Sequence, residues 1–179
     1  VITSRMGTLA ATRCRERGLA VVEPPAEVDI DDWVIHQLQA ASPDLVCLCG
    51  YLRLLPIPPW LKQRVINIHP ALLPDFGGQG MHGEAVHQAV LESGRTESGC
   101  TVHLIDEAYD HGPTILQRRC PVKSGDDAMS LANRVFLEEC LAMPDAIKLI
   151  AARRVRIQDG PIAIAPLGTR WPDAIPPST

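Results

Sequence analysis

Apolar runs and segments with helical periodicity alternate along this chain. Apolar residues recur at helical spacing over 33–41, and the following run, Leu45–Cys49, is almost continuously apolar. Continuous rather than alternating apolarity is typical of strands that are buried on both faces, as in a parallel sheet. The pattern therefore predicts a helix followed by an interior strand.

Further elements are predicted on both sides of this segment. Residues 9–17 have the pattern of a helix that ends at Gly18, and 100–105 and 114–122 have the pattern of strands. Before these strands, a helix is expected to carry an apolar stripe formed by Ala85, Val86, Ala89 and Val90. A last helix is expected over 127–141, with an inner face formed by Ala128, Leu131, Ala132, Val135 and Phe136.

Strands and helices in this order predict a doubly wound α/β fold, with a mostly parallel sheet and flanking helices. A chain of 179 residues is long enough for one core and short for two full domains. We therefore expect a single domain over 1–179. From about residue 161 the sequence is rich in proline, and this tail is expected to run over the surface.

Composition narrows the class of protein. A net charge of −4 and a pI near 5.8 provide no basic excess for nucleic acid or anionic lipid. Six cysteines without CxxC spacing, and no recognisable secretory leader, indicate reduced thiols in a cytoplasmic protein. No apolar run reaches the roughly 20 residues that span a bilayer. We expect small-molecule substrates, and neither nucleic acid nor membrane as a partner.

The segment 65–70, Val-Ile-Asn-Ile-His-Pro, carries the clearest candidate site. Side chains alternate across a strand, so Asn67 and His69 point to one face. Pro70 cannot donate to a sheet ladder, and the strand should end there. A hydrogen-bond donor and a titratable base are thus expected together at the carboxyl end of a strand, where open α/β sheets bind ligands.

A second candidate group is the acidic segment 106–113 between two predicted strands. A carboxylate from this segment is expected to approach His69 and to raise the pKa of its imidazole. On the residues alone, Asp106 and Asp110 are equally good candidates. The alternative is a solvated turn, because Gly-Pro is ordinary turn punctuation.

Two other features concern single residues. Helical periodicity places Glu139 on the apolar stripe of the last helix, where an acid is costly unless it is paired or faces a cleft. Five histidines lie between 69 and 111, but none forms the His-x-x-x-His pair that helical zinc sites prefer. A metal site is not expected.

Several motifs together resemble a known family. These are Asn67–Pro74, Gly99–His103, Asp106–Pro113 and Ile115–Gln117. They closely resemble the phosphoribosylglycinamide formyltransferases, which belong to the folate-dependent formyltransferases, and the resemblance runs from near residue 1 to at least Ile150. The run His-Pro-Ala-Leu-Leu-Pro is more similar to these enzymes than to the formyltetrahydrofolate deformylases.

The resemblance implies a Rossmann-like formyltransferase fold and assigns roles to residues. Asn67, His69 and Asp110 match the catalytic positions, which favours Asp110 over Asp106, and Thr101 and His103 match supporting positions. The positions that match the folate site are Tyr51, Leu52, Arg53, Leu54, Leu55, Asn67, Asp106, Glu107, Ala108, Tyr109 and Asp110. Those that match the ribonucleotide site are Pro70, Gly78, Phe136 and Glu139.

The activity implied by the resemblance is transfer of the formyl group of 10-formyltetrahydrofolate to the amine of glycinamide ribonucleotide, in de novo purine biosynthesis. No metal is implied. Two other hypotheses stand beside it: a hydrolase of formyltetrahydrofolate, and a non-catalytic folate-binding remnant. The remnant is considered because 1–4 matches the family's second strand, so that an N-terminally truncated fold without the first strand and its phosphate loop is expected.

Overall fold

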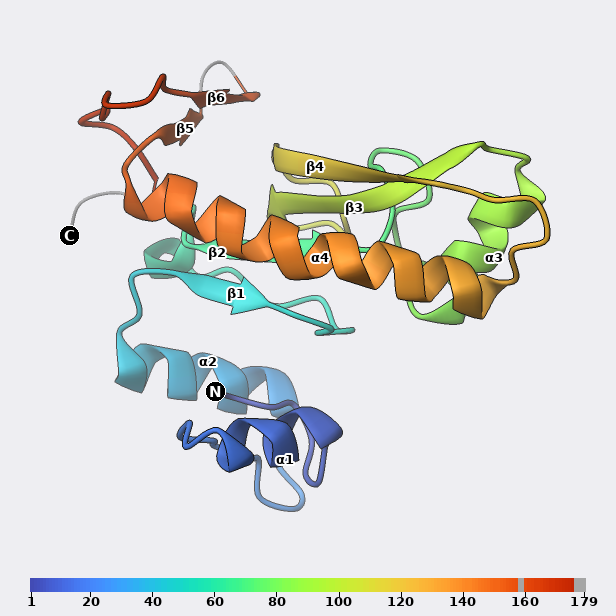
Figure 1. The fold of residues 1–179 in the computed structure, drawn as a ribbon. Coiled ribbons are helices and arrows are strands. Elements are labelled where there is room, and N and C mark those ends of the chain that lie inside the picture. The colour runs from blue at the N-terminus through green and yellow to red at the C-terminus, as the bar shows by residue number, and fades with distance from the viewer. Residues whose placement is uncertain (158–159, 176–179) are drawn as a thin grey trace. The chain divides into compact units, whose positions relative to one another are not determined.

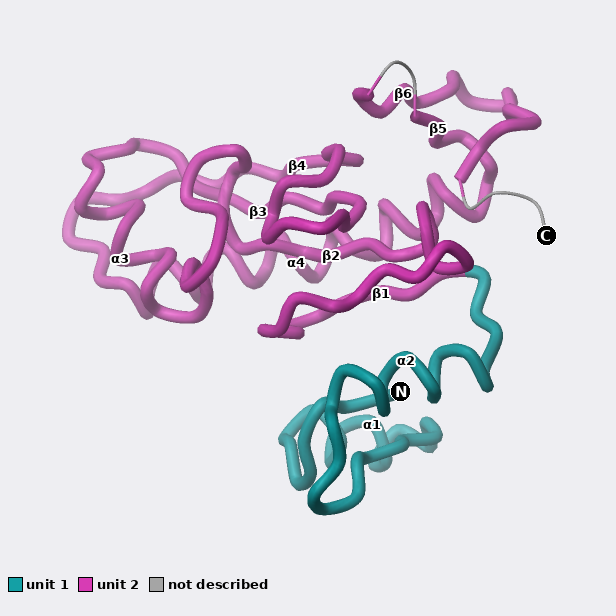
Figure 2. Tube along the Cα trace, turned by 180° about the vertical axis from the view of Figure 1, so that it is seen from behind, with its two compact units in different colours: residues 1–44 teal, residues 45–179 magenta. Residues whose placement is uncertain are grey.

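The structure, a computed structural model, describes residues 1–157 and 160–175. The chain divides into two compact units, 1–44 and 45–179, which are described separately below (Figure 2).

The first unit contains helices α1 (Leu9–Glu16) and α2 (Ile30–Ala41). Each helix begins at a side-chain cap: the Thr8 hydroxyl accepts from a backbone N–H of α1, and the Asp29 carboxylate accepts from two of α2. Ile2 pairs with Val22 in an isolated parallel bridge. The helix predicted over 9–17 is thus confirmed to within one residue.

The second unit is built on a four-stranded sheet. Its strands, in spatial order, are β1 (Val46–Leu48), β2 (Val65–His69), β3 (Glu97–Leu104) and β4 (Thr114–Pro121) (Figure 1). β1 and β2 are parallel, whereas β2–β3 and β3–β4 are antiparallel. The sheet is mixed, so the expectation of a mostly parallel sheet is wrong. Only nine residues, 105–113, join β3 to β4, whereas a parallel crossover needs a dozen or more.

Two helices accompany this sheet, α3 (Glu84–Glu92) and α4 (Ala128–Ala151), and a 3₁₀ turn, η1 (Pro59–Leu61), precedes β2. In Figure 1, α4 runs along the sheet, where it contacts β3 and β4. A capping box between Asp127 and Ser130 starts it.

α4 does not end at residue 141, as the sequence pattern suggested, but continues through Pro144 to Ala151. Its later turns bury Ala142, Ala146 and Ile150. Burial of this apolar stripe outweighs the one backbone hydrogen bond that a proline removes.

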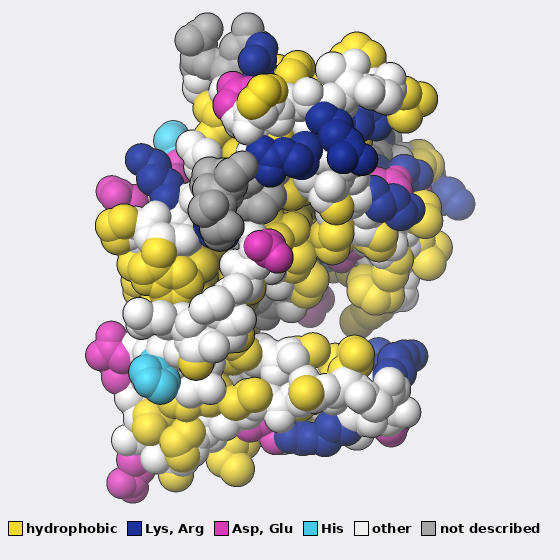
Figure 3. All heavy atoms as spheres, turned by 90° about the vertical axis from the view of Figure 1, so that its left-hand side faces the viewer, with side chains coloured by type: hydrophobic (Ala, Val, Ile, Leu, Met, Phe, Trp, Pro, Cys, Tyr) yellow, Lys and Arg dark blue, Asp and Glu magenta, His cyan; other side chains and the backbone are white. Residues whose placement is uncertain are grey.

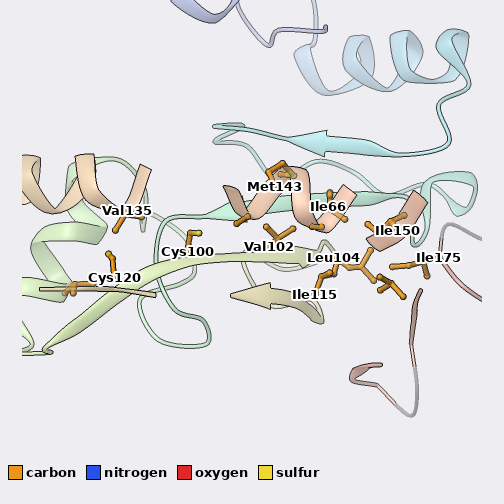
Figure 4. Packing of buried hydrophobic residues seen from close by; sticks show 14 of the residues in the cluster. Ile66, Cys100, Val102, Leu104, Ile115, Cys120, Val135, Met143, Ile150 and Ile175 are labelled. Atoms are coloured by element: carbon orange, nitrogen blue, oxygen red, sulfur yellow. The ribbon is translucent and has the colours of Figure 1, made fainter. Parts of the chain in front are cut away.

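The core of the second unit lies between α4 and the sheet (Figure 4). Its buried members come from the strands, both helices and the segment after α4: Ile66, Val90, Cys100, Val102, Leu104, Ile115, Cys120, Leu131, Val135, Ala142, Met143, Ala146, Ile150, Val155 and Ile175. This packing holds β2 and β3, the two strands that carry the candidate site, against a long helix.

After α4, the chain forms an antiparallel pair, β5 (Val155–Ile157) and β6 (Ile162–Ile164). The tail that was predicted from about residue 161 thus includes β6, and its residues 176–179 lie outside the described part of the chain. The Arg156 guanidinium stacks 4.1 Å from the centre of the Trp171 ring. Figure 3 shows lysine and arginine side chains concentrated in the upper half of the view.

Within the described residues, no helix combines the length and the apolar character that crossing a bilayer requires.

Candidate functional site

The register of β2 against β3 brings the candidate side chains onto one face of the sheet. Asn67 lies opposite His103, and His69 lies opposite Thr101. Residues that face each other across an antiparallel pair project to the same side. The segment that follows β3 then returns Asp110 to this face.

His69 is almost fully buried and is held between two oxygen atoms. Its Nε2 lies 2.8 Å from the backbone carbonyl oxygen of Phe76, and its Nδ1 lies 3.4 Å from Oδ2 of Asp110. A carbonyl oxygen only accepts, so Nε2 carries a hydrogen and donates it. Nδ1 is therefore the nitrogen that can gain or lose a proton, beside a carboxylate.

Asn67 and His103 form a second contact on this face. Nδ1 of His103 donates to the carbonyl oxygen of Leu104 over 2.8 Å, which leaves Nε2 as an acceptor. The amide nitrogen of Asn67 lies 3.2 Å from that Nε2 and donates to it. This contact orients Asn67 and leaves its second amide hydrogen available for another acceptor.

Asp110 connects these two pairs. Besides its contact with His69, its Oδ1 lies 3.6 Å from Nε2 of His103, and its Oδ2 accepts from the backbone N–H of Gly78 at 3.0 Å. Its backbone is left-handed, with φ at 53°, a conformation that aspartate tolerates better than most residues. A tight turn thus directs this carboxylate inward.

Burial has opposite effects on the pKa values of Asp110 and His69. Burial raises the pKa of Asp110, but the neighbouring imidazoles of His103 and His69 and the hydrogen bond from the Gly78 N–H outweigh it, and the net pKa lies below the usual value. Burial also lowers the pKa of His69, and here Asp110 and the Phe76 carbonyl do not compensate fully. The expected net rise in the pKa of His69 is therefore wrong, and an ionised Asp110 faces a neutral imidazole near pH 7.

These side chains border a cavity of about 930 Å³, near the upper end of the range for small-molecule sites. Fifteen residues that sequence reasoning selected line it: Tyr51, Leu52, Arg53, Leu54, Leu55, Asn67, His69, Pro70, Gly78, His103, Ala108, Tyr109, Asp110, Phe136 and Glu139. The structure thus brings together most of the predicted catalytic, folate-site and ribonucleotide-site positions.

Three of the selected residues do not line the cavity: Asp106, Glu107 and Thr101. Asp106 instead accepts from His111 at 2.7 Å and from the backbone N–H of Ala108, on the exposed side of the segment.

Thr101 is fully buried and lies behind the site. Its hydroxyl donates to the carbonyl oxygen of Ala71 at 2.7 Å and accepts from the N–H of Leu73 at 3.0 Å. Gln117 donates to the same hydroxyl and to the Leu73 carbonyl. Thr101 therefore holds the chain that leaves β2 after His69.

Glu139 and Phe136 reach the cavity from α4. Burial alone raises the pKa of Glu139 to about 7, because no cation or hydrogen-bond donor offsets the loss of water. Phe136 is 58% exposed, so its predicted place on the core face is wrong. Both side chains instead belong to the wall of the cavity.

Sequence reasoning missed His87 of α3, which is buried and lines the cavity. The predicted stripe placed Ala85 and Ala89 inward, whereas Val86, His87 and Val90 are the buried residues. Val86 and Val90 define the centre of the buried face of α3. The sequence does not show whether the alanines on one side of these valines or the histidine on the other side is covered. The one signal in the sequence was the glycine-rich loop 77–83 before α3, which indicates that a binding site lies near the start of this helix.

Among residues 1–157 and 160–175, no group of three histidine, cysteine or acidic side chains is placed to hold a metal ion. That the chemistry needs no metal stays a prediction.

The described geometry can be compared with known proteins. Residues 20–147 match the family model of the formyl transferases. The chain is 36% identical to a chloroplastic phosphoribosylglycinamide formyltransferase of Arabidopsis thaliana over 87% of its own length and 56% of that protein's. It is 37% identical to the trifunctional purine biosynthetic protein adenosine-3 of Drosophila pseudoobscura pseudoobscura, again over 87% of the chain but 12% of the larger protein.

Among solved structures, glycinamide ribonucleotide transformylase 1 from Symbiobacterium toebii is similar, with a TM-score of 0.81 and 37% identity. That match covers 93% of this chain and 79% of the other. The chain thus spans about half the length of the plant relative and a small part of the insect one. Since the plant relative is named as chloroplastic, the expected cytoplasmic location stays a prediction.

Proposed function

Because the chain belongs to the formyl transferase family, we propose that it transfers the formyl group of 10-formyltetrahydrofolate to the amine of glycinamide ribonucleotide, a step of purine biosynthesis. The observation that carries the proposal is the convergence of Asn67, His69 and Asp110 on one cavity. The relatives named as phosphoribosylglycinamide formyltransferases support the choice of substrates.

In this proposal, Asn67 stabilises the oxygen of the formyl group. Attack of an amine on the formyl carbon moves negative charge onto that oxygen. One amide hydrogen of Asn67 is used by His103, and the other is free to donate to the oxygen. A well-placed donor of this kind contributes roughly 3–4 kcal/mol.

His69 moves the proton. The attacking nitrogen becomes positive and must lose a proton, while the folate nitrogen must gain one to depart. The neutral imidazole takes up the proton at Nδ1, where the resulting imidazolium lies between the Asp110 carboxylate and the Phe76 carbonyl. It then returns the proton to the folate nitrogen, and such acid–base assistance is worth roughly 10²- to 10⁴-fold.

Asp110 supplies the charge that makes this transfer favourable. Its pKa lies below the usual value, so it stays ionised while His69 changes charge.

The folate is assigned to the side formed by 51–55 and 108–110, and the ribonucleotide to the side where Glu139 reaches the cavity. Neutral Glu139 donates a hydrogen bond, and ionised Glu139 accepts one.

The test is an assay of the purified chain with 10-formyltetrahydrofolate, with and without glycinamide ribonucleotide. The proposal expects formylated ribonucleotide and deformylated folate in equal amounts, and no turnover without the acceptor. Formate release at the same rate with or without the acceptor would instead identify a hydrolase. Binding of a folate analogue without either product would identify a non-catalytic folate-binding protein.

A further inference from the structure

Three side chains from neighbouring strands form a row beside the candidate site. His69 on β2 lies opposite Thr101 on β3, and Thr101 lies opposite Gln117 on β4. Residues that face each other across antiparallel strands project to the same side of the sheet. The row therefore reaches from the imidazole that moves the proton to a glutamine that does not line the cavity.

The segment that leaves β2, residues 71–78, is fixed to this row near its start. The hydroxyl of Thr101 donates to the carbonyl oxygen of Ala71 at 2.7 Å and accepts from the N–H of Leu73 at 3.0 Å. The side-chain amide of Gln117 donates to the carbonyl oxygen of Leu73 at 2.8 Å and to the Thr101 hydroxyl at 3.0 Å. Both backbone groups of Leu73 are therefore held, the N–H by Thr101 and the carbonyl by Gln117.

Later residues of the same segment contact two of the groups assigned to the reaction. The carbonyl oxygen of Phe76 accepts from Nε2 of His69 at 2.8 Å. The N–H of Gly78 donates to Oδ2 of Asp110 at 3.0 Å. The position of the segment therefore sets both the acceptor of the imidazole and a donor to the carboxylate.

Little free space separates the start of the segment from these later residues. A Cβ added at Gly77 would lie 2.6 Å from Cδ2 of Leu73 and 3.1 Å from the Cβ of Asp110. Closely packed groups transmit displacements to one another. A shift of Leu73 therefore moves the residues that follow it.

Neutral His69 has one imidazole hydrogen and two acceptors that compete for it. The Phe76 carbonyl oxygen lies 2.8 Å from Nε2, and a carboxylate oxygen of Asp110 lies 3.4 Å from Nδ1. An ionised carboxylate is the stronger acceptor, so the hydrogen stays on Nε2 only while the carbonyl is held at the shorter distance. With the hydrogen on Nδ1, that nitrogen cannot take up a proton from the amine.

We propose that Gln117 is a positioning residue of the formyl transfer, which acts on His69 through the backbone of segment 71–78. It holds the carbonyl of Leu73, and the segment in turn holds the Phe76 carbonyl where Nε2 of His69 donates to it. This inference rests on the proposed transferase activity and adds to it a residue outside the cavity wall.

The pKa of His69 reports on this arrangement. Burial lowers that pKa, whereas the charge of Asp110 and the hydrogen bond to the Phe76 carbonyl raise it. His103 and His87 are the other titratable groups that interact with the imidazole. Of all these groups, only the Phe76 carbonyl depends on the proposed contact. Its loss takes one acceptor from the imidazolium and none from the neutral form, which turns to the carboxylate, and so lowers the pKa further.

The test changes Gln117 in two ways. Gln117→Met keeps the length of the side chain and has no donor, whereas Gln117→Glu keeps its shape and, when ionised, accepts but cannot donate. Gln88→Met, the same change at an exposed position of α3 outside the cavity wall, is the matched control.

For both Gln117 variants we expect kcat to fall about tenfold, the effect of one lost hydrogen bond, with KM for both substrates unchanged. The acid limb of the pH–rate profile should move to lower pH, and Gln88→Met should behave like the unmodified chain. An unchanged kcat would overturn the proposal. So would a lower kcat with an unmoved acid limb, because that would indicate a purely structural role.

Nitrogen NMR of the histidine rings separates this proposal from the proposed function. The signals of His69 are those that His69→Ala lacks, and their positions show which ring nitrogen carries the hydrogen. We expect the hydrogen on Nε2 in the unmodified chain, and partly on Nδ1 in both Gln117 variants. Hydrogen that stays on Nε2 in both variants refutes the role of Gln117 even in an active transferase. A change of position in a chain without transfer activity would instead support the contact and reject the proposed function.

Discussion

At the scale of single residues, two carboxyl groups of the same cavity have opposite tendencies. Asp110 accepts a hydrogen bond from the Gly78 N–H and lies beside two imidazoles, and its pKa lies below the usual value. Burial without such partners raises the pKa of Glu139 to about 7. The surroundings, not the residue type, therefore keep Asp110 ionised near pH 7 and allow Glu139 to change its protonation state there.

Asp110→Asn tests the role of the permanent charge. Without the carboxylate, the imidazolium of His69 loses its counter-charge, and we expect kcat to fall about 10³-fold with little change in the folding of the chain. Steady-state formyl transfer and a circular dichroism spectrum are the measurements. Asp106→Asn, whose carboxylate bonds to exposed His111, should cost much less, and the reverse order would mean that the wrong acid has been assigned.

Glu139→Gln tests the raised pKa. A raised pKa means that the folded protein binds the proton more tightly than the unfolded chain. The stability is then complete below about pH 4.5 and decreases as the pH rises to about 7. The full shift corresponds to about 3 kcal/mol, and solvent screening reduces it because Glu139 is only partly buried. Since glutamine does not ionise, the variant should gain about 2 kcal/mol relative to the unmodified chain at pH 8 and nothing at pH 4.5.

Urea unfolding at the two pH values measures this difference. Glu16→Gln, at the exposed end of α1, is the control for the removal of one carboxylate and is unfolded at the same two pH values. Equal stability of Glu139→Gln and the unmodified chain at pH 8 would contradict the raised pKa of Glu139.

At the scale of elements, local pattern predicted β2 and the common face of Asn67 and His69. It did not predict strand direction, because apolar runs look alike in parallel and antiparallel sheets. The length of segment 105–113 does indicate that β3 and β4 are antiparallel, because nine residues are too few for the crossover that parallel strands need. The predicted buried face of α3 was rotated by one position from the observed one. Neither alanine nor histidine shows by its residue type whether it lies in the core, in a cavity wall or in solvent.

Gly112→Ala tests the segment that presents Asp110. A Cβ at this position would lie 2.0 Å from the carbonyl oxygen of Leu104, which is backbone and cannot turn away. The segment must shift, and we expect a loss of about 3 kcal/mol in unfolding free energy together with a loss of activity.

Gly125→Ala is the comparison for that change. Its Cβ would meet no atom within 4 Å, and only its positive φ opposes the substitution, so a cost of about 1 kcal/mol is expected. Thermal unfolding of both variants is the measurement. A Gly112→Ala protein as stable as Gly125→Ala would contradict the close approach of this segment to β3.

At the scale of the whole molecule, every cavity residue belongs to the second unit, although the residues span 48–143 of the sequence. Spacing and periodicity identified Asn67 and His69 as a pair, and they left Asp106 and Asp110 undecided. The resemblance to a family resolved that choice and supplied 51–55. Neither the periodicity nor the resemblance placed His87 in the wall of the cavity, because its burial depends on which residues lie against α3 in space.

A folate analogue should stabilise the whole molecule. A ligand that binds only the folded chain adds about 2.7 kcal/mol at one hundred times its dissociation constant, which corresponds to a rise in Tm of roughly 5–10 °C for a chain of this size. Differential scanning calorimetry with the analogue provides the measurement. No rise at a saturating concentration would mean that the cavity does not accept folate.

The central claim is that Asn67, His69 and Asp110 act as one unit at one point, and a double-mutant cycle of formyl transfer tests it most directly. If His69 and Asp110 share one proton, His69→Ala combined with Asp110→Asn should be about as slow as His69→Ala alone. If the two losses multiply, the imidazole and the carboxylate act independently and the account is wrong.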